Sequence, residues 1–142
     1  MNLEFGIREG MAFTLHGHDA VVAHAREAAP DECCGLLLGR DGEIVEAVRA
    51  RNIAGDPAVR FLIDPDDHFR AIRTARARSL DIVGFYHSHP RSAAEPSARD
   101  LAEFDHPGHL YAIVSLRTEP AEVRLFRFAS GNFQPVSFVT VA

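Results

Sequence analysis

The sequence predicts a single α+β domain, in which helices pack against one mixed, mostly antiparallel β-sheet. Two observations lead to this prediction. Short apolar or alternating runs typical of strands recur along the chain, and longer stretches carry apolar residues at helical spacing. The 142 residues contain neither an internal repeat nor a linker, so we expect one domain over residues 1–142.

The first half of the chain opens with a short expected strand near residues 11–15. A helix is predicted for DAVVAHAREAAP, residues 19–30, because its valines and alanines form one apolar stripe and the final proline prevents continuation. CCGLLLG, residues 33–39, is predicted to be a buried strand. RDG then forms a hairpin turn, and EIVEAVRA, residues 43–50, is the alternating partner strand.

The second half begins with a short expected strand over RFLID, residues 60–64. The next helix, residues 64–79, is well defined, since Asp64 suits the N-cap and Pro65 the first helical position. DIVGFYHSH, residues 81–89, is apolar and rich in β-formers, which predicts a central strand. A short helix and three further strands are expected over residues 97–104, 109–116, 122–129 and 133–141.

Composition narrows the classes of partner and the compartment. The formal net charge of −5 argues against general nucleic-acid binding. No apolar run reaches membrane-spanning length, and residues 1–13 lack the apolar core of a secretion signal. Cys33 and Cys34 are adjacent, which suits a disulfide poorly. We therefore expect reduced thiols, a cytoplasmic location, and neither a membrane nor a nucleic acid as partner.

A candidate metal site lies at the end of the predicted central strand. Side chains alternate between the faces of a strand, so His87 and His89 point the same way, about 7 Å apart. If the loop after Pro90 turns back, Asp100 in the next helix reaches the same ion. Two histidines and one carboxylate leave a fourth position for water, which is the arrangement of catalytic zinc. The same donors do not exclude iron or manganese.

A simpler interpretation of these residues needs no metal. Ser97 and Asp100 form an S-x-x-D pattern of the capping-box type. His16 and His18 repeat the H-x-H spacing at a strand-to-helix junction, where we interpret them as cap and loop. A hydrolytic metal also needs a general base, and Glu32, at the start of the strand in PDECCGLLLG, is the candidate. Composition alone would make Glu32 a solvated charge.

Two segments together resemble the JAMM metallopeptidases, the family of MPN+ domains. The family pattern is a glutamate before a cysteine–glycine strand, then H-x-H-P, six residues, S, two residues and D. ECCGLLLG, from residue 32, and HSHPRSAAEPSARD, from residue 87, fill every position of it. The resemblance covers essentially the whole chain. It implies the MPN fold, a sheet between layers of helices similar to that of the cytidine deaminases.

The resemblance also implies roles for the residues of the pattern. His87, His89 and Asp100 would hold zinc, Glu32 would be the general base, and Ser97 would donate a hydrogen bond to the oxyanion or serve only as the helix cap. The implied activity is zinc-dependent peptidase or isopeptidase cleavage after the C-terminal Gly-Gly of a ubiquitin-like or sulfur-carrier protein. The compact chain favours the sulfur carrier, with cysteine among the leaving residues.

Two other interpretations remain open on the same fold. One is a non-catalytic MPN scaffold for protein contacts, which the complete set of ligands disfavours. The other is a peptidase acting on cell-wall peptides, which the expected cytoplasmic location disfavours. No oligomeric state is predicted.

Overall fold

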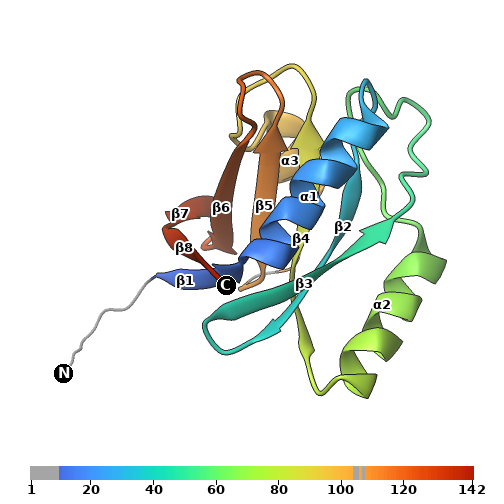
Figure 1. Cartoon of the computed structure of the whole chain (residues 1–142). Coiled ribbons are helices and arrows are strands. Elements are labelled where there is room, and N and C mark those ends of the chain that lie inside the picture. The colour runs from blue at the N-terminus through green and yellow to red at the C-terminus, as the bar shows by residue number, and fades with distance from the viewer. Residues whose placement is uncertain (1–9, 104–105, 107) are drawn as a thin grey trace.

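A single eight-stranded mixed sheet carries helices on both faces in the computed structural model, which describes residues 10–103, 106 and 108–142 (Figure 1). No helix among these residues has the length and hydropathy that crossing a bilayer requires. In chain order the elements are β1 (Met11–Thr14), α1 (Leu15–Ala28), β2 (Cys34–Arg40), β3 (Glu43–Ala50), α2 (Pro65–Ala77), β4 (Asp81–His89), α3 (Ala98–Glu103), β5 (Leu110–Ser115), β6 (Glu122–Ala129), β7 (Asn132–Val136) and β8 (Phe138–Val141).

The strand order β7-β6-β5-β4-β2-β3-β1-β8 places β4 in the middle of the sheet. β4 pairs antiparallel with β2 and parallel with β5, as predicted for a central strand. The β1–β3, β1–β8 and β4–β5 pairs are parallel, and the other four pairs are antiparallel. Because both edges of β4 are hydrogen-bonded, the side chains at its end project from a fixed backbone.

Alternate residues of β2 divide the interior into two cores. Leu37 packs with residues of α1 on one face, whereas Leu36 and Leu38 pack with residues of α2 on the other. The two long helices therefore cover opposite faces of the sheet (Figure 1). Each fully buried leucine contributes about 1.5–3 kcal/mol through the hydrophobic effect.

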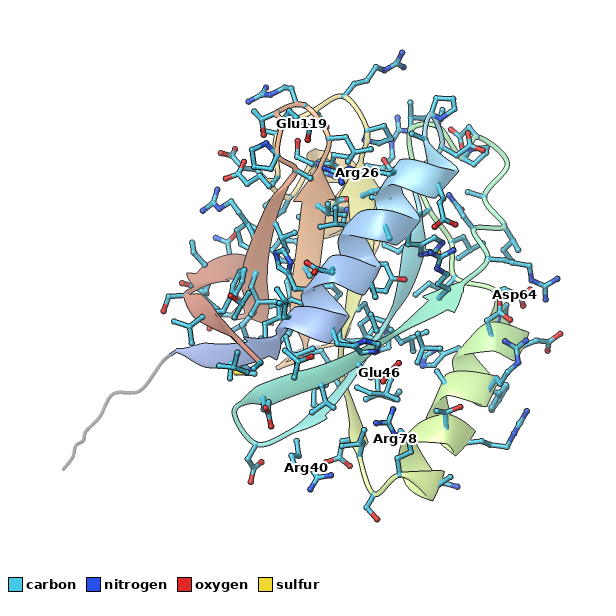
Figure 2. All side chains as sticks on the ribbon, in the orientation of Figure 1. Arg26, Arg40, Glu46, Asp64, Arg78 and Glu119 are labelled. Carbon is cyan, nitrogen blue, oxygen red and sulfur yellow. The ribbon has the colours of Figure 1, made fainter. Side chains whose placement is uncertain are left out.

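Two ion pairs link these helices to a sheet strand and to a loop between strands (Figure 2). Arg26 of α1 lies 3.0 Å from Glu119, between β5 and β6, and Arg78, at the end of α2, lies 2.8 Å from Glu46 of β3. Exposed pairs of this kind contribute about 0.2–1 kcal/mol each. The apolar faces of the helices therefore contribute most of the stability, and the ion pairs fix the helix ends.

Helix α1 starts earlier than predicted, directly after β1. Thr14 is its N-cap: the hydroxyl oxygen accepts a hydrogen bond from Gly17 N at 3.0 Å and donates one to the Val45 carbonyl at 2.9 Å. His16 and His18 therefore lie within the helix, and their interpretation as cap and loop was wrong. A cap at the last strand residue leaves no room for a connecting loop.

The predicted strand over residues 60–64 was also wrong. These residues belong to the segment between β3 and α2, residues 51–64, which we call the 51–64 loop. In the described residues its ladder contact is a single bridge between Asn52 and Ile63. Leu62 N donates to Asn52 Oδ1 at 3.0 Å. A side chain therefore accepts the hydrogen bond that the backbone of a neighbouring strand would accept in a sheet.

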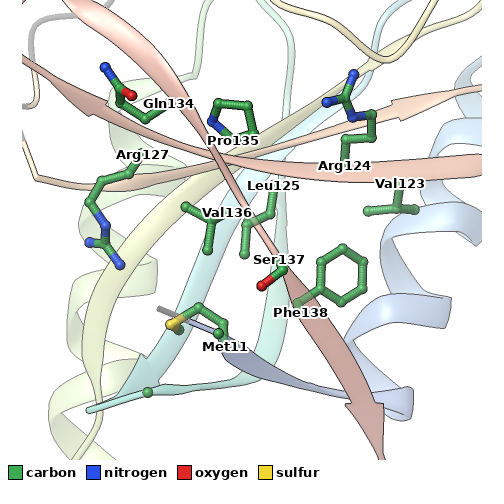
Figure 3. Close-up of a pocket in the computed structure, with 12 residues that line it drawn as sticks. Met11, Val123, Arg124, Leu125, Arg127, Gln134, Pro135, Val136, Ser137 and Phe138 are labelled. Carbon is green, nitrogen blue, oxygen red and sulfur yellow. The ribbon is translucent and has the colours of Figure 1, made fainter. Parts of the chain in front are cut away.

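The single strand predicted over residues 133–141 is two strands. β7 pairs with β6, β8 pairs with β1, and these partners stand near opposite ends of the strand order. Because Ser137 alone joins β7 to β8, the sheet curls until its two ends meet; the Ser137 carbonyl accepts from Met11 N at 3.0 Å. The curl leaves a groove of about 970 Å³ lined by residues that include Met11, Leu125, Val136 and Phe138 (Figure 3).

A half-buried histidine joins α1 to β4. His24 Nδ1 lies 2.7 Å from the Tyr86 hydroxyl, and the two rings meet edge to face. Burial, assisted by the positive charge of Arg49, lowers the pKa of His24 from 6.5 to about 4. The folded protein therefore favours the neutral imidazole.

This lowered pKa predicts acid sensitivity. Between pH 4 and 6.5 the unfolded chain binds more protons than the folded chain, so stability is lost as the pH falls through that window. Acidification from pH 7 to 5 should destabilise the wild type by roughly 1 kcal/mol more than His24→Gln, after allowance for the partial exposure of His24. Urea unfolding with a chelator present measures this difference, and equal acid sensitivity of the two proteins would contradict the prediction.

Candidate metal centre and active site

Three buried polar side chains converge where β4 ends. His87 Nε2, His89 Nε2 and Asp100 Oδ2 form a triangle in which every side measures 3.2 Å. All three residues are buried. The structure thus brings together the three residues that the sequence pattern offers as metal ligands.

The dimensions of this triangle suit a metal ion. Tetrahedral coordination with bonds of about 2.0–2.1 Å places neighbouring ligand atoms about 3.3 Å apart. The 3.2 Å separations in the triangle are close to this value. Unprotonated imidazole nitrogens and a carboxylate oxygen repel one another at such distances unless positive charge lies between them. The donor set therefore fits a divalent cation.

The loop after β4 turns back toward the sheet and brings the third donor into place. Ala94, in this loop, is buried against Ile113 of β5 in a small apolar cluster. Ser115 Oγ donates to the Ser92 carbonyl at 2.6 Å. Both contacts pin the loop against the end of β5, so α3 begins beside the histidines and Asp100, in its first turn, faces them.

Neighbouring groups orient the two imidazoles. His89 Nδ1 lies 2.8 Å from the Ala93 carbonyl, which can only accept a hydrogen bond, so Nδ1 carries the hydrogen. The lone pair on Nε2 of His89 is thereby directed into the triangle. The ring of His87 is stacked on Phe61, with 4.5 Å between ring centroids and an interplanar angle of 21°. Phe61 comes from a distant part of the chain, and no local sequence pattern predicts this contact.

The pKa directions favour the coordinating forms of the side chains. Burial lowers the pKa of His87 and keeps its imidazole neutral. Burial acts to raise the pKa of Asp100, but hydrogen bonds with His87 and His89 outweigh it and hold this pKa far below the ordinary value. Burial likewise opposes protonation of His89, yet the hydrogen bond to Asp100 raises its pKa. A metal ion therefore competes with a proton at His89.

Ser97 and Asp100 form the reciprocal capping box of α3. Ser97 N donates to Asp100 Oδ2 at 2.9 Å, and Asp100 N donates to Ser97 Oγ at 3.0 Å. The capping box and the ligand triangle share Oδ2 of Asp100, so the two interpretations of this motif coexist. Ser97 Oγ is the acceptor within the box, which leaves its hydroxyl hydrogen for another acceptor.

Glu32 is buried in the turn before β2 and lies outside the ligand triangle. The next residue, Cys33, is hydrogen-bonded to Ser88, which lies between the two histidines in the sequence of β4. Cys33 N donates to Ser88 Oγ at 2.8 Å, and Ser88 N donates to the Cys33 carbonyl at 3.1 Å. The charge of Glu32 contributes to the raised pKa of His89. Glu32 thus stands beside the triangle without belonging to it.

The two cysteines are free and buried, as expected for reduced thiols. Burial raises the pKa of Cys33 to about 11 and that of Cys34 to about 12. Both thiols stay protonated at neutral pH, and a protonated thiol is a poor nucleophile. Packing is therefore their role beside the site.

Residues 15–129 match the family described as prokaryotic homologs of the JAB domain. The chain belongs to this family. The desampylase of Haloferax volcanii is 36% identical over 111 aligned positions, in a match that covers 74% of this chain and 80% of that protein. The CysO-cysteine peptidase of Mycobacterium tuberculosis is 31% identical over 126 aligned positions, in a match that covers 85% of this chain and 86% of that protein. These matches confirm the resemblance to the JAMM/MPN+ family, in its prokaryotic branch.

The fold agrees with this assignment. A JAB1/MPN domain protein from Archaeoglobus fulgidus superimposes with a TM-score of 0.64 over 93% of this chain and the whole of that chain, at 20% identity. The predicted α+β class, with a mixed sheet flanked by helices, is thereby confirmed.

The triangle predicts metal binding that depends on each donor. Wild-type protein should bind one divalent ion per chain. Loss of a group that only hydrogen-bonds to a metal ligand costs up to about 100-fold in metal affinity, so loss of a ligand itself in His87→Ala should weaken binding by more than about 100-fold. Glu32→Gln, which leaves the triangle intact, is the matched control and should keep full stoichiometry. Elemental analysis after dialysis against a weak chelator measures the difference. Equal metal content in wild type and His87→Ala would refute the site.

Proposed function

We propose that the protein is a zinc-dependent hydrolase that cuts the amide bond after the C-terminal Gly-Gly of a ubiquitin-like or sulfur-carrier protein. The observation that carries this proposal is the triangle of three buried donors with a separate buried carboxylate, Glu32, beside it. The relatives named desampylase and CysO-cysteine peptidase support both the hydrolytic reaction and the class of substrate.

The donor set supports zinc as the metal. Two imidazoles and one carboxylate in a buried site, with one position left for water, are the arrangement of catalytic zinc enzymes. When bound, zinc supplies Lewis-acid polarisation of the substrate carbonyl and a water that loses its proton near neutral pH. Elemental analysis distinguishes zinc from iron and manganese, which the same ligands accept.

The protein's own groups move the protons. In the proposed reaction Glu32 takes a proton from the attacking water and then delivers it to the leaving amine, so the C–N bond breaks and a carboxylate and a free amine are released. Ser97 donates a hydrogen bond to the carbonyl oxygen as it gains charge. No covalent intermediate with the chain is needed, in keeping with the protonated thiols of Cys33 and Cys34.

The direct test uses small Gly-Gly-terminated carrier proteins extended by cysteine or by a folded protein. Mass spectrometry should show cleavage directly after Gly-Gly by the wild type, loss of cleavage with a chelator, and recovery with zinc. Glu32→Gln should lose about 10²–10⁴-fold in kcat while it keeps its metal. A fully active Glu32→Gln would refute the base assignment. Zinc-loaded wild type that cleaves no Gly-Gly substrate would indicate a scaffold, and cleavage of cell-wall peptides alone would indicate the other peptidase.

Two substitutions separate the proposed roles of Ser97. Ser97→Ala removes both the cap and the hydroxyl donor, and we expect a loss of about 10²-fold in kcat with the metal retained. Ser97→Asp restores a good N-cap but no donor at neutral pH. If Ser97 stabilises the oxyanion, Ser97→Asp remains as inactive as Ser97→Ala. Recovery of kcat in Ser97→Asp, measured on the same carrier substrate, would leave Ser97 with the capping role alone.

A further inference from the structure

The side chain of Asn52 is the centre of a hydrogen-bond network next to the candidate site. Its Nδ2 donates to the carbonyls of Glu32 and Arg60, each at 3.0 Å. Its Oδ1 accepts from Ala54 N and Leu62 N, also at 3.0 Å each. Carbonyl oxygens can only accept and amide N–H groups can only donate, so these four partners fix which way the amide points.

Glu32 is held by its backbone on both sides. Its N–H donates to the Pro57 carbonyl at 2.8 Å, and its own carbonyl accepts from Asn52. Both partners belong to the 51–64 loop. Glu32 lies before the first residue of β2, so strand pairing reaches it only through Cys33 and its bonds to Ser88. The 51–64 loop, together with the bonds of Cys33 to Ser88, therefore sets where the backbone of Glu32 lies and where its side chain begins.

The same loop is docked against the metal ligands. Phe61 stacks on His87, and Arg99, which precedes Asp100, donates to the Val59 carbonyl at 3.3 Å. The loop thus contacts β4, which carries the two histidines, α3, which carries Asp100, and Glu32. Asn52 fastens two points of this loop, at residues 54 and 62, to the backbone of Glu32.

We propose that Asn52 is a positioning residue for Glu32. It sets the distance between the Glu32 carboxylate and the reacting water without contact with the metal ligands or the substrate. The inference rests on the proposed function, because it requires Glu32 to be the general base. Misplacement of a reacting group by about 1 Å can cost 10²-fold in rate, so a smaller displacement from one lost anchor should cost about 10-fold in kcat.

Two variants and a control test this role. Asn52→Ala removes the whole network, whereas Asn52→Asp keeps the acceptor for Ala54 N and Leu62 N and loses the donor to Glu32. Asp56→Asn is the matched control, because Asp56 is exposed in the same loop and its carboxylate pairs with Arg60 at 3.7 Å. We expect both Asn52 variants to lose about 10-fold in kcat, with KM and metal content within twofold of wild type. Asp56→Asn should match the wild type.

Two further measurements separate positioning from loop folding. Glu32→Asp already displaces the carboxylate by one methylene, so adding Asn52→Ala to it should cost less than about threefold, whereas independent effects would multiply in full. The acidic limb of the pH profile of kcat/KM reports the base. The pH at the midpoint of this limb should change in the Asn52 variants and remain unchanged in Asp56→Asn.

The outcomes that overturn the inference differ from those that overturn the proposed function. Wild-type kcat in the Asn52 variants, metal loss in parallel with kcat, or an undiminished effect in the Glu32→Asp background would each remove the positioning role. In all of these cases an inactive Glu32→Gln leaves the proposed hydrolase standing. A fully active Glu32→Gln would instead remove the base, and the positioning role with it. If Asn52→Ala does not fold, Asn52→Asp carries the test through its retained bonds to the loop.

Discussion

The convergence of three buried donors at 3.2 Å is the constraint on which the rest of this structure depends. A buried carboxylate and two neutral imidazoles are costly to hold together unless a cation joins them, so each must be fixed by its surroundings. The central strand fixes two donors through its alternation. The capping box and the anchored loop after β4 fix the third, Asp100, from outside the sheet. The mixed strand order serves this purpose, because it pairs the ligand strand on both edges.

Local spacing made the convergence of the three donors predictable from the sequence. An H-x-H pair on a strand shares a face, and an S-x-x-D pattern begins a helix, so both relations follow from backbone geometry within 14 residues, from His87 to Asp100. The position of Glu32 follows no such rule. It depends on the pairing of β2 with β4, in which Cys34 lies opposite His87, and only the family resemblance pointed to it.

The incorrect fold predictions share a physical cause: in each of them, contacts with residues distant in the sequence determine where the element begins or ends. Thr14 starts α1 early because the Val45 carbonyl and Gly17 N complete its hydrogen bonds. Residues 133–141 have uniform strand character, and only their pairing with β6 on one side and β1 on the other divides them at Ser137. Asn52 looks like an ordinary loop residue in the sequence, because its side chain bonds to backbone groups that come together only on folding.

The site divides its two tasks between two kinds of support. Contacts to the imidazole rings orient the histidines, through the Ala93 carbonyl for His89 and the Phe61 ring for His87. Hydrogen bonds to the backbone, from the 51–64 loop and from Ser88, locate the peptide that carries Glu32. Bonds to the backbone fix where the Glu32 side chain begins without using the carboxylate oxygens to which proton transfer is proposed. Because the two kinds of support differ, the proposed metal affinity and the placement of Glu32 can change independently, and a small displacement of Glu32 would leave the three donors in place.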